Sequence, residues 1–208
     1  MMEAAALFNL RAREYQEKFM DTSLYHHTFR AFCDYILKHG AHILELACGP
    51  GNITQYLIAA RPDFQLLCTD IAPQMLELAK ANNPSANYQL LDCRDIGKLT
   101  QQFDGIMCGF VLPYISRKEA AKLIADTAKL LHPGGVLYLS TMEGDYDMSG
   151  MQTNSYGDEV QVYYHDAEWL SQNLRRYHFT VTDIQRFDSP GANGVISRDL
   201  IIIATKAG

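Results

Sequence analysis

The sequence predicts a single α/β domain in which a doubly wound, mostly parallel sheet of seven strands carries helices on both faces. Three observations predict it: short apolar runs alternate with amphipathic helical stretches, acidic residues stand at the ends of three successive runs, and two extended segments close the chain. Such alternation is typical of parallel sheets covered by helices. The length of 208 residues suffices for one full core and is short for two.

The composition favours a cytoplasmic protein without a nucleic-acid partner. Lys and Arg total 18 against 24 Asp and Glu, so the formal net charge of -6 repels polyanions. The first ten residues lack the basic and apolar regions of a signal peptide, and no apolar run is long enough to span a membrane. The five cysteines are odd in number and show no close metal-ligand spacing, which favours reduced thiols and no metal site.

Residues 1–40 show helical periodicity and no strand signal, so we expect helices at the start of the chain. Leu7 and Tyr15 can share one helical face, and the apolar positions between Phe29 and Leu37 can share another. Gly40 is a suitable end for the second helix.

After residue 41 the pattern changes to short apolar runs that alternate with helices. We expect strands at 42–47, 65–69, 86–91, 103–108 and 136–140, and helices at 53–60, 73–81 and 119–131. The last of these helices has clear amphipathic spacing, and the His-Pro-Gly-Gly segment at 132–135 breaks it.

The end of the chain predicts a helix followed by a hairpin. The helix is expected at 167–177 and the extended segments at 179–187 and 199–205, with turn residues at 188–194 between them. The final strand should therefore run antiparallel to the others. Residues 142–165 show little periodicity and follow the carboxyl end of a strand, where open parallel sheets bind ligands. They form either a lid or substrate loop, or a plain surface excursion.

A glycine-rich loop and two aspartates predict a ligand site at one edge of the sheet. Gly49 and Gly51 lie where a strand turns into a helix, which allows close backbone approach and offers free N–H groups, although a tight turn alone would also need glycine. Asp70 follows Gly51 by 19 residues and ends the next strand, the position from which a carboxylate accepts ribose hydroxyls. Asp92 ends the third strand, and Glu45 lies near the end of the first. Because carboxylates are seldom buried unpaired, three acids on one rim indicate ligand contacts.

From about residue 41 to 205 the sequence resembles the class I S-adenosylmethionine-dependent methyltransferases. The stretch from Ile43 to Thr54 is similar to the first motif of that family, and the stretches at 67–71, 90–93, 103–108 and 131–135 are similar to later motifs in the same order. The resemblance implies a Rossmann-like fold with an antiparallel seventh strand, and S-adenosylmethionine as cofactor with S-adenosylhomocysteine as product. It implies cofactor contacts from Tyr15, Glu45, Ala47, Cys48, Gly49, Gly51, Asn52, Asp70, Ile71, Met75, Asp92, Cys93, Cys108, Gly109 and Phe110.

The resemblance also implies a division of labour within the single domain of residues 1–208. Residues 1–40 form a helical cap, 41–141 the cofactor-binding half, 142–165 the lid or substrate loop, and 166–208 a helix with the closing hairpin.

Two positions bear on the alternatives. Ala47 stands where the family usually has the first glycine of its loop, a place where Ala is often tolerated. Thr54 stands where the nicotinamide-cofactor fingerprint requires a third glycine, and this weakens the alternative of an NAD-type oxidoreductase. A third hypothesis is a non-catalytic domain that binds S-adenosylmethionine and acts through a partner.

Methyl transfer from a sulfonium is an in-line displacement in which the protein mainly aligns the nucleophile. A general base is needed only for a neutral hydroxyl acceptor. Tyr114, Glu143 and His165 are candidates for a catalytic role, each against a packing role, and Tyr163 borders the expected lid. The segment from Gly109 to Tyr114 lacks the motif of enzymes that methylate nucleic-acid bases. We therefore expect a small-molecule acceptor, with no nucleic-acid or membrane partner; a homodimer is compatible with the resemblance.

Overall fold

The computed structural model describes residues 4–154, 156–190 and 196–208. The strands of the main sheet are β1 (His42–Leu46), β2 (Gln65–Asp70), β3 (Asn87–Leu90), β4 (Phe103–Cys108), β5 (Leu131–Met142), β8 (Phe179–Pro190) and β9 (Ile196–Lys206). The helices are α1 (Ala4–Leu10), α2 (Ala12–Phe19), α3 (His26–Tyr35), α4 (Asn52–Ala60), α5 (Pro73–Asn82), α6 (Arg117–Leu130) and α7 (Ala167–Arg176).

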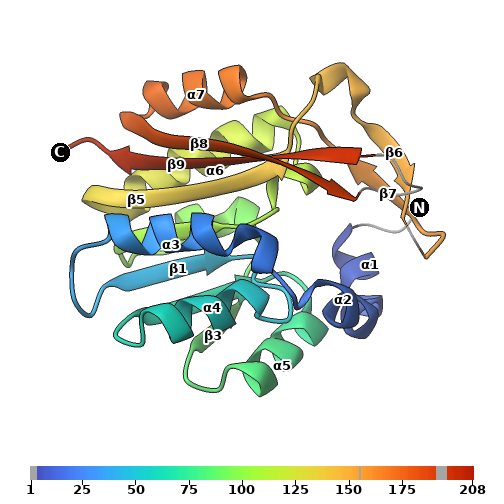
Figure 1. Cartoon of the computed structure of the whole chain (residues 1–208), viewed down its shortest axis with the longest axis horizontal. Helices are drawn as coiled ribbons and strands as arrows, with labels where there is room; N and C mark the ends of the chain where they lie inside the picture. The colour runs from blue at the N-terminus through green and yellow to red at the C-terminus, as the bar shows by residue number, and fades with distance from the viewer. Residues whose placement is uncertain (1–3, 155, 191–195) are drawn as a thin grey trace.

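The seven strands lie in the order β3-β2-β1-β4-β5-β9-β8 (Figure 1). Strands β1 to β5 pair in parallel, whereas β9 is antiparallel to both of its neighbours, β5 and β8. This confirms the predicted mostly parallel sheet with an antiparallel final strand. The order reverses at β1 and β4, and open α/β sheets bind ligands beside such a reversal.

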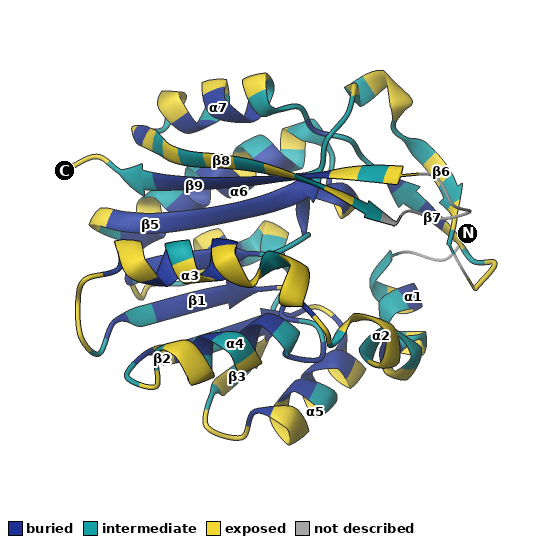
Figure 2. Cartoon of the chain, in the orientation of Figure 1, coloured by how far each residue is buried: buried dark blue, intermediate teal, exposed yellow. Residues whose placement is uncertain are grey.

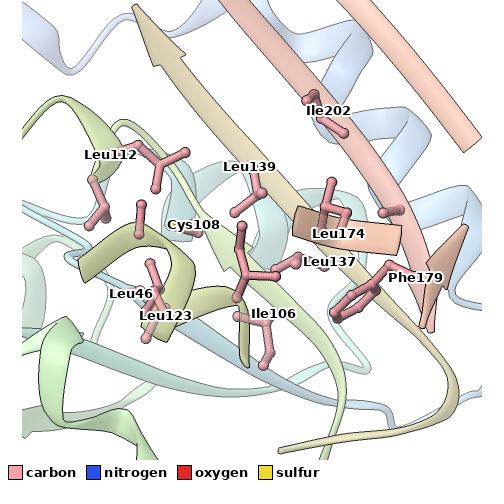
Figure 3. Packing of buried hydrophobic residues seen from close by; sticks show 14 of the residues in the cluster. Leu46, Ile106, Cys108, Leu112, Leu123, Leu137, Leu139, Leu174, Phe179 and Ile202 are labelled. Carbon is pink, nitrogen blue, oxygen red and sulfur yellow. The ribbon is translucent and has the colours of Figure 1, made fainter. Parts of the chain in front are cut away.

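Apolar residues of the strands alternate between the two faces of the sheet. In β1, Leu44 and Leu46 pack with α6 and α7, whereas Ile43 packs with α3 and α4 on the opposite face. Figure 2 shows the central strands as buried and the outer faces of the helices as exposed. Figure 3 shows the packing on the α6 and α7 side, where Leu123 and Leu174 meet strand residues. Helices therefore cover both faces of the sheet, as predicted.

Helix α6 begins two residues earlier than the spacing predicts. Ser116 is its N-cap, and Glu119 closes a capping box by accepting a hydrogen bond from the Ser116 backbone N–H at 2.8 Å. The capping box thus fixes the Glu119 carboxylate at the start of the helix.

Three expected strand boundaries are wrong by three residues or more, and one of them is the start of β9 at Ile196 instead of residue 199. Strand β5 begins at Leu131 instead of residue 136, because Leu131 pairs with Phe103 before a register shift brings Val136 opposite Gly105. Strand β8 continues to Pro190, so 188–190 extend a strand that was expected to turn there. The rest of that expected turn, 191–194, lies outside the described residues.

The segment 142–165 contains regular structure that the sequence did not predict. Strands β6 (Gly150–Thr153) and β7 (Glu159–Val162) form a separate antiparallel hairpin, preceded by a short 3₁₀ turn, Tyr146–Met148. Helix α1 packs on this hairpin through Leu7, which contacts Val160 and Val162. Figure 1 shows α1, α2 and the hairpin gathered at the carboxyl ends of β1 and β2. Helix α3, by contrast, packs on the sheet itself.

Candidate functional site

A cavity of about 430 Å³ lies at the carboxyl ends of β1, β2 and β4, between the sheet and the layer formed by α1, α2 and the β6–β7 hairpin. This is the edge at which open α/β sheets bind ligands. Its lining brings together eleven of the predicted site residues: Tyr15, Ala47, Gly49, Asp70, Ile71, Met75, Asp92, Cys93, Gly109, Phe110 and Tyr114.

The loop after β1 turns through three left-handed residues, Ala47, Gly49 and Gly51. Ala47 has a φ of 48°, a conformation that a non-glycine residue seldom adopts, which explains the usual preference for glycine there. Gly49 has a φ of 55°, and a Cβ there would make only an ordinary contact of 3.7 Å with the Tyr15 ring, so the backbone conformation is what favours glycine at this position. The loop therefore presents backbone to the cavity and to the start of α4.

Asp70 joins the loop after β1 to the end of β2. One carboxylate oxygen accepts the Gly49 backbone N–H at 2.9 Å and the other accepts the Ala72 N–H at 2.8 Å. Burial raises the pKa of the Asp70 carboxyl, and the two N–H groups oppose that effect. Asp70 thus both holds the loop and faces the cavity, where it can accept hydroxyl groups.

Asp92 is held by Arg94, a residue that the sequence analysis did not select. The guanidinium contacts the Asp92 carboxylate at 2.6 to 3.0 Å and reaches Glu119 at 3.4 Å. Burial acts to raise the pKa of Asp92, but the Arg94 hydrogen bonds outweigh it and keep the pKa below its usual range. All three side chains line the cavity.

The end of β4 is strained at Phe110. Its φ is 52°, and its backbone N–H is fixed by the Ser140 hydroxyl at 2.8 Å. A Cβ on the neighbouring Gly109 would come within 2.4 Å of the Ile53 Cδ1 atom, so a larger residue there would require the Ile53 side chain to shift. Non-glycine residues in this conformation cluster at ligand sites.

Five residues expected to contact the cofactor do not line the cavity: Glu45, Cys48, Gly51, Asn52 and Cys108. Gly51 is required for a different reason, because its Cβ would lie 2.4 Å from the Asn83 side chain of the segment after α5. The Asn52 amide donates to the Phe19 carbonyl at 2.8 Å and so ties α4 to α2.

Glu45 lies under the glycine-rich loop and is fully enclosed. It accepts hydrogen bonds from the Thr54 hydroxyl at 2.7 Å and from the Cys68 thiol at 3.6 Å, and its Oε1 atom has no partner among the described residues. Burial raises the pKa of Glu45 to about 7. Thr54 stands at the position where a dinucleotide fingerprint needs glycine. Its side chain is buried and donates its hydrogen bond to Glu45.

Of the three catalytic candidates, only Tyr114 faces the cavity. Glu143 forms an ion pair with Arg186 at 2.6 Å, outside the cavity lining. His165 is fully buried, and its Nε2 atom lies 3.0 Å from the Leu112 carbonyl oxygen and 3.1 Å from that of Ile115. Through these contacts His165 holds the turn that carries Tyr114 in place.

Nine lining residues were not predicted: Ala4, Ala5, Phe8, Arg94, Val111, Ile115, Glu119, Met151 and Gln161. Tyr163 was expected only as a border of the lid. Position relative to a strand end identifies none of the cap and hairpin residues, because tertiary docking brings them to the cavity.

In residues 4–154, 156–190 and 196–208, no cluster of three or more His, Cys, Asp or Glu side chains is arranged to hold a metal ion. No helix in those ranges has the length and apolar character needed to cross a membrane.

Residues 43–135 match the model of a methyltransferase domain family. Among curated proteins, a ubiquinone biosynthesis O-methyltransferase of Xanthomonas oryzae pv. oryzae is 30% identical over 108 residues, which make up 50% of this chain and 44% of that protein. The chain thus matches less than half the length of this relative.

Two solved structures share almost the whole fold. An S-adenosylmethionine-dependent methyltransferase from Clostridium acetobutylicum has a TM-score of 0.73 and 16% identity, covering 97% of this chain and 100% of that one. A DhpI–SAH complex has a TM-score of 0.75 and 17% identity, covering 98% of this chain and 95% of that one. At such identities the likeness shows the Rossmann-like fold.

Proposed function

We propose that this chain is a class I S-adenosylmethionine-dependent methyltransferase, supported by its fold and by the match of residues 43–135, and that it transfers the methyl group of that cofactor to a small molecule. The observation that carries the proposal is the cavity at the carboxyl ends of β1, β2 and β4, into which the glycine-rich loop, Asp70 and Asp92 converge.

The residues around the cavity suit the parts of the cofactor. Asp70 would accept the ribose hydroxyls, and the exposed edge of Ile71 with Met75 would cover the adenine ring. Asp92, whose carboxylate is held by Arg94, would accept a hydrogen bond from the adenine amino group. The Ala47 to Gly49 backbone and the Tyr15 ring would enclose the methionine end, so the sulfonium would point to the space beneath Phe8 and Tyr114.

When bound, the cofactor supplies an electrophilic methyl group, and the protein's task is to align the acceptor behind it. Residues of the cap and the hairpin line this space together with the edge of the sheet. We extend the proposal to the domain division: residues of α1 and α2 act as the cap and 142–165 as the acceptor-binding segment. A cytoplasmic location, which the five free cysteines favour, and a homodimer remain part of the proposal.

Differential scanning fluorimetry tests the cofactor assignment. S-adenosylhomocysteine at 100 times its dissociation constant should add about 2.7 kcal/mol of stability and raise the Tm by about 5–10 °C, whereas NAD should not. A shift with NAD alone would favour the oxidoreductase alternative, for which the comparisons give no support. A shift with S-adenosylhomocysteine but no product with any acceptor would favour the non-catalytic alternative.

A further inference from the structure

The chemistry of the acceptor can be inferred from the part of the cavity that the nucleotide residues leave free. Three segments line that part: helix α1 with Phe8, the turn after β4 with Tyr114, and the end of the β6–β7 hairpin with Tyr163, the residue after β7. The lining residues from these segments, Ala4, Ala5, Phe8, Val111, Tyr114, Ile115, Met151, Gln161 and Tyr163, carry no charge. An acceptor with an apolar framework therefore fits these walls.

No described residue of the lining is placed to remove a proton from the acceptor. The lining contains neither His nor Lys, and its carboxylates are Asp70, Asp92 and Glu119. Asp70 is occupied by two backbone N–H groups and Asp92 by the Arg94 guanidinium. Both also face the nucleotide end of the cavity.

Glu119 is the third carboxylate of the lining, and it is also engaged. It accepts the Ser116 backbone N–H at 2.8 Å and the Ser116 hydroxyl at 2.7 Å, and Arg94 lies 3.4 Å away. Burial acts to raise the pKa of Glu119, but these hydrogen bonds outweigh it and the pKa lies below its usual range. A carboxylate stabilised in this way is a poor base.

The cavity is instead supplied with hydroxyl donors. Tyr15, Tyr114 and Tyr163 line it, and their hydroxyls form no hydrogen bond in the part of the chain that the structure describes. Burial raises the pKa of Tyr114 to about 12 and also raises the pKa of Tyr15 and Tyr163, so all three stay protonated at neutral pH. A protonated phenol can donate a hydrogen bond to an anion, whereas it cannot accept the proton of a neutral alcohol.

Resting on the proposed function, we propose that the acceptor is an apolar acid that ionises by itself in water, a thiol or an acidic phenol, and that the hydroxyls of Tyr114 and Tyr163 donate hydrogen bonds to its anion. The acceptor loses its proton to solvent before the reaction. Its anionic sulfur or oxygen then attacks the methyl carbon, and the bond from that carbon to the sulfonium breaks. The electron pair of the broken bond stays on the sulfur, so the cofactor becomes a neutral thioether. An amine is less suitable, because its N–H groups need acceptors and the carboxylates of the cavity are already paired.

A matched panel of single-ring acceptors tests the proposal. With S-adenosylmethionine at pH 7, we expect product from thiophenol and from a nitrophenol that is ionised at that pH, and none above background from benzyl alcohol or aniline. With unsubstituted phenol, kcat/KM should rise about tenfold per pH unit below the pKa of phenol itself, because the anion is the reacting form. Turnover of benzyl alcohol or aniline at a rate comparable to thiophenol would overturn the proposal, as would an absence of turnover with all five acceptors.

Binding provides a second readout that does not depend on turnover. Nitrophenol is coloured only as its anion, so an absorbance titration in the presence of S-adenosylhomocysteine gives its pKa when bound. We expect that pKa to fall below the value in free solution, and to fall less in Tyr114→Phe and in Tyr163→Phe. Tyr177→Phe, a tyrosine outside the cavity lining, is the matched control and should behave as the parent protein. An unchanged bound pKa in the parent protein contradicts the role of the tyrosines.

Two different results distinguish a wrong acceptor class from a wrong proposed function. If S-adenosylhomocysteine does not stabilise the protein, the cofactor assignment itself is wrong. If it does stabilise the protein and neutral alcohols are methylated, the proposed function stands and the acceptor class is refuted.

Discussion

The substitution Gly51→Ala tests why the glycine-rich loop has its shape. Gly51 has a φ of 85°, and a Cβ there would lie 2.4 Å from the Asn83 amide nitrogen and 3.3 Å from the Ala79 backbone. The left-handed conformation costs an L-residue about 1–2 kcal/mol, and overpacking in a rigid site costs about 1–3 kcal/mol. Displacing Asn83 also breaks its hydrogen bond to the Gly51 carbonyl, which contributes about 1 kcal/mol. The free energy of unfolding should therefore fall by about 3–6 kcal/mol.

Gly134→Ala is the matched control for this experiment. Gly134 has a φ of 77°, but no atom lies within 4 Å of its Cβ position, so only the conformational cost of about 1–2 kcal/mol applies. Urea denaturation of the two variants and the parent protein gives both losses. Equal losses would refute the reasoning, because they would mean that packing against Asn83 contributes nothing at Gly51.

Three further predictions concern groups around the cavity. Glu45 has a folded pKa near 7 against 4.5 for a free carboxyl, so its protonated form is favoured by folding. The stability that protonated Glu45 contributes is complete below about pH 4.5 and is lost as the pH rises through about 7. Between pH 5 and pH 8 the free energy of unfolding of Glu45→Gln should therefore rise by up to about 3 kcal/mol relative to that of the parent protein. Parallel curves of unfolding free energy against pH for the two proteins would contradict this. Arg11 bonds both carboxylate oxygens of Asp158 at 3.1 and 3.3 Å and so fastens α2 to the segment between β6 and β7. Arg11→Met should speed S-adenosylhomocysteine release in stopped-flow assays about two- to fivefold, whereas Arg30→Met, which loses an exposed pair with Asp34, should not; identical rates in both variants would argue against a closed cover. Glu143 lies in an ion pair outside the cavity lining, so Glu143→Gln should leave kcat/KM unchanged, and a large loss would restore it as a catalytic candidate.

The parts of the fold that could be predicted are those with strong local patterns. Strand β4 has the predicted bounds, Phe103–Cys108, because its apolar residues, Phe103 and 106–108, are buried in the centre of the sheet. The β6–β7 hairpin was not predicted because each of its strands has only four residues, and Val160 and Val162 are the only buried residues in the two strands. So little apolar periodicity is indistinguishable from a loop.

The candidate site divides in the same way. Asp70 and Asp92 were found from their positions at strand ends, and both face the cavity. Glu45 has an equivalent position, but it points under the loop to Thr54, and strand position alone cannot tell the two orientations apart. Phe8 and Tyr163 reach the cavity only because α1 docks on the hairpin, and that contact joins segments more than 150 residues apart.

Calorimetric titration with S-adenosylhomocysteine tests the central claim, that the cavity beside Asp70 is the cofactor site. The account predicts one binding site per chain and an affinity reduced about 10- to 100-fold in Asp70→Asn, which loses a charged acceptor for hydroxyl groups, with no change in Asp188→Asn, an exposed aspartate on β8. An absence of binding heat in the parent protein, or equal affinities in the parent protein and Asp70→Asn, would contradict it.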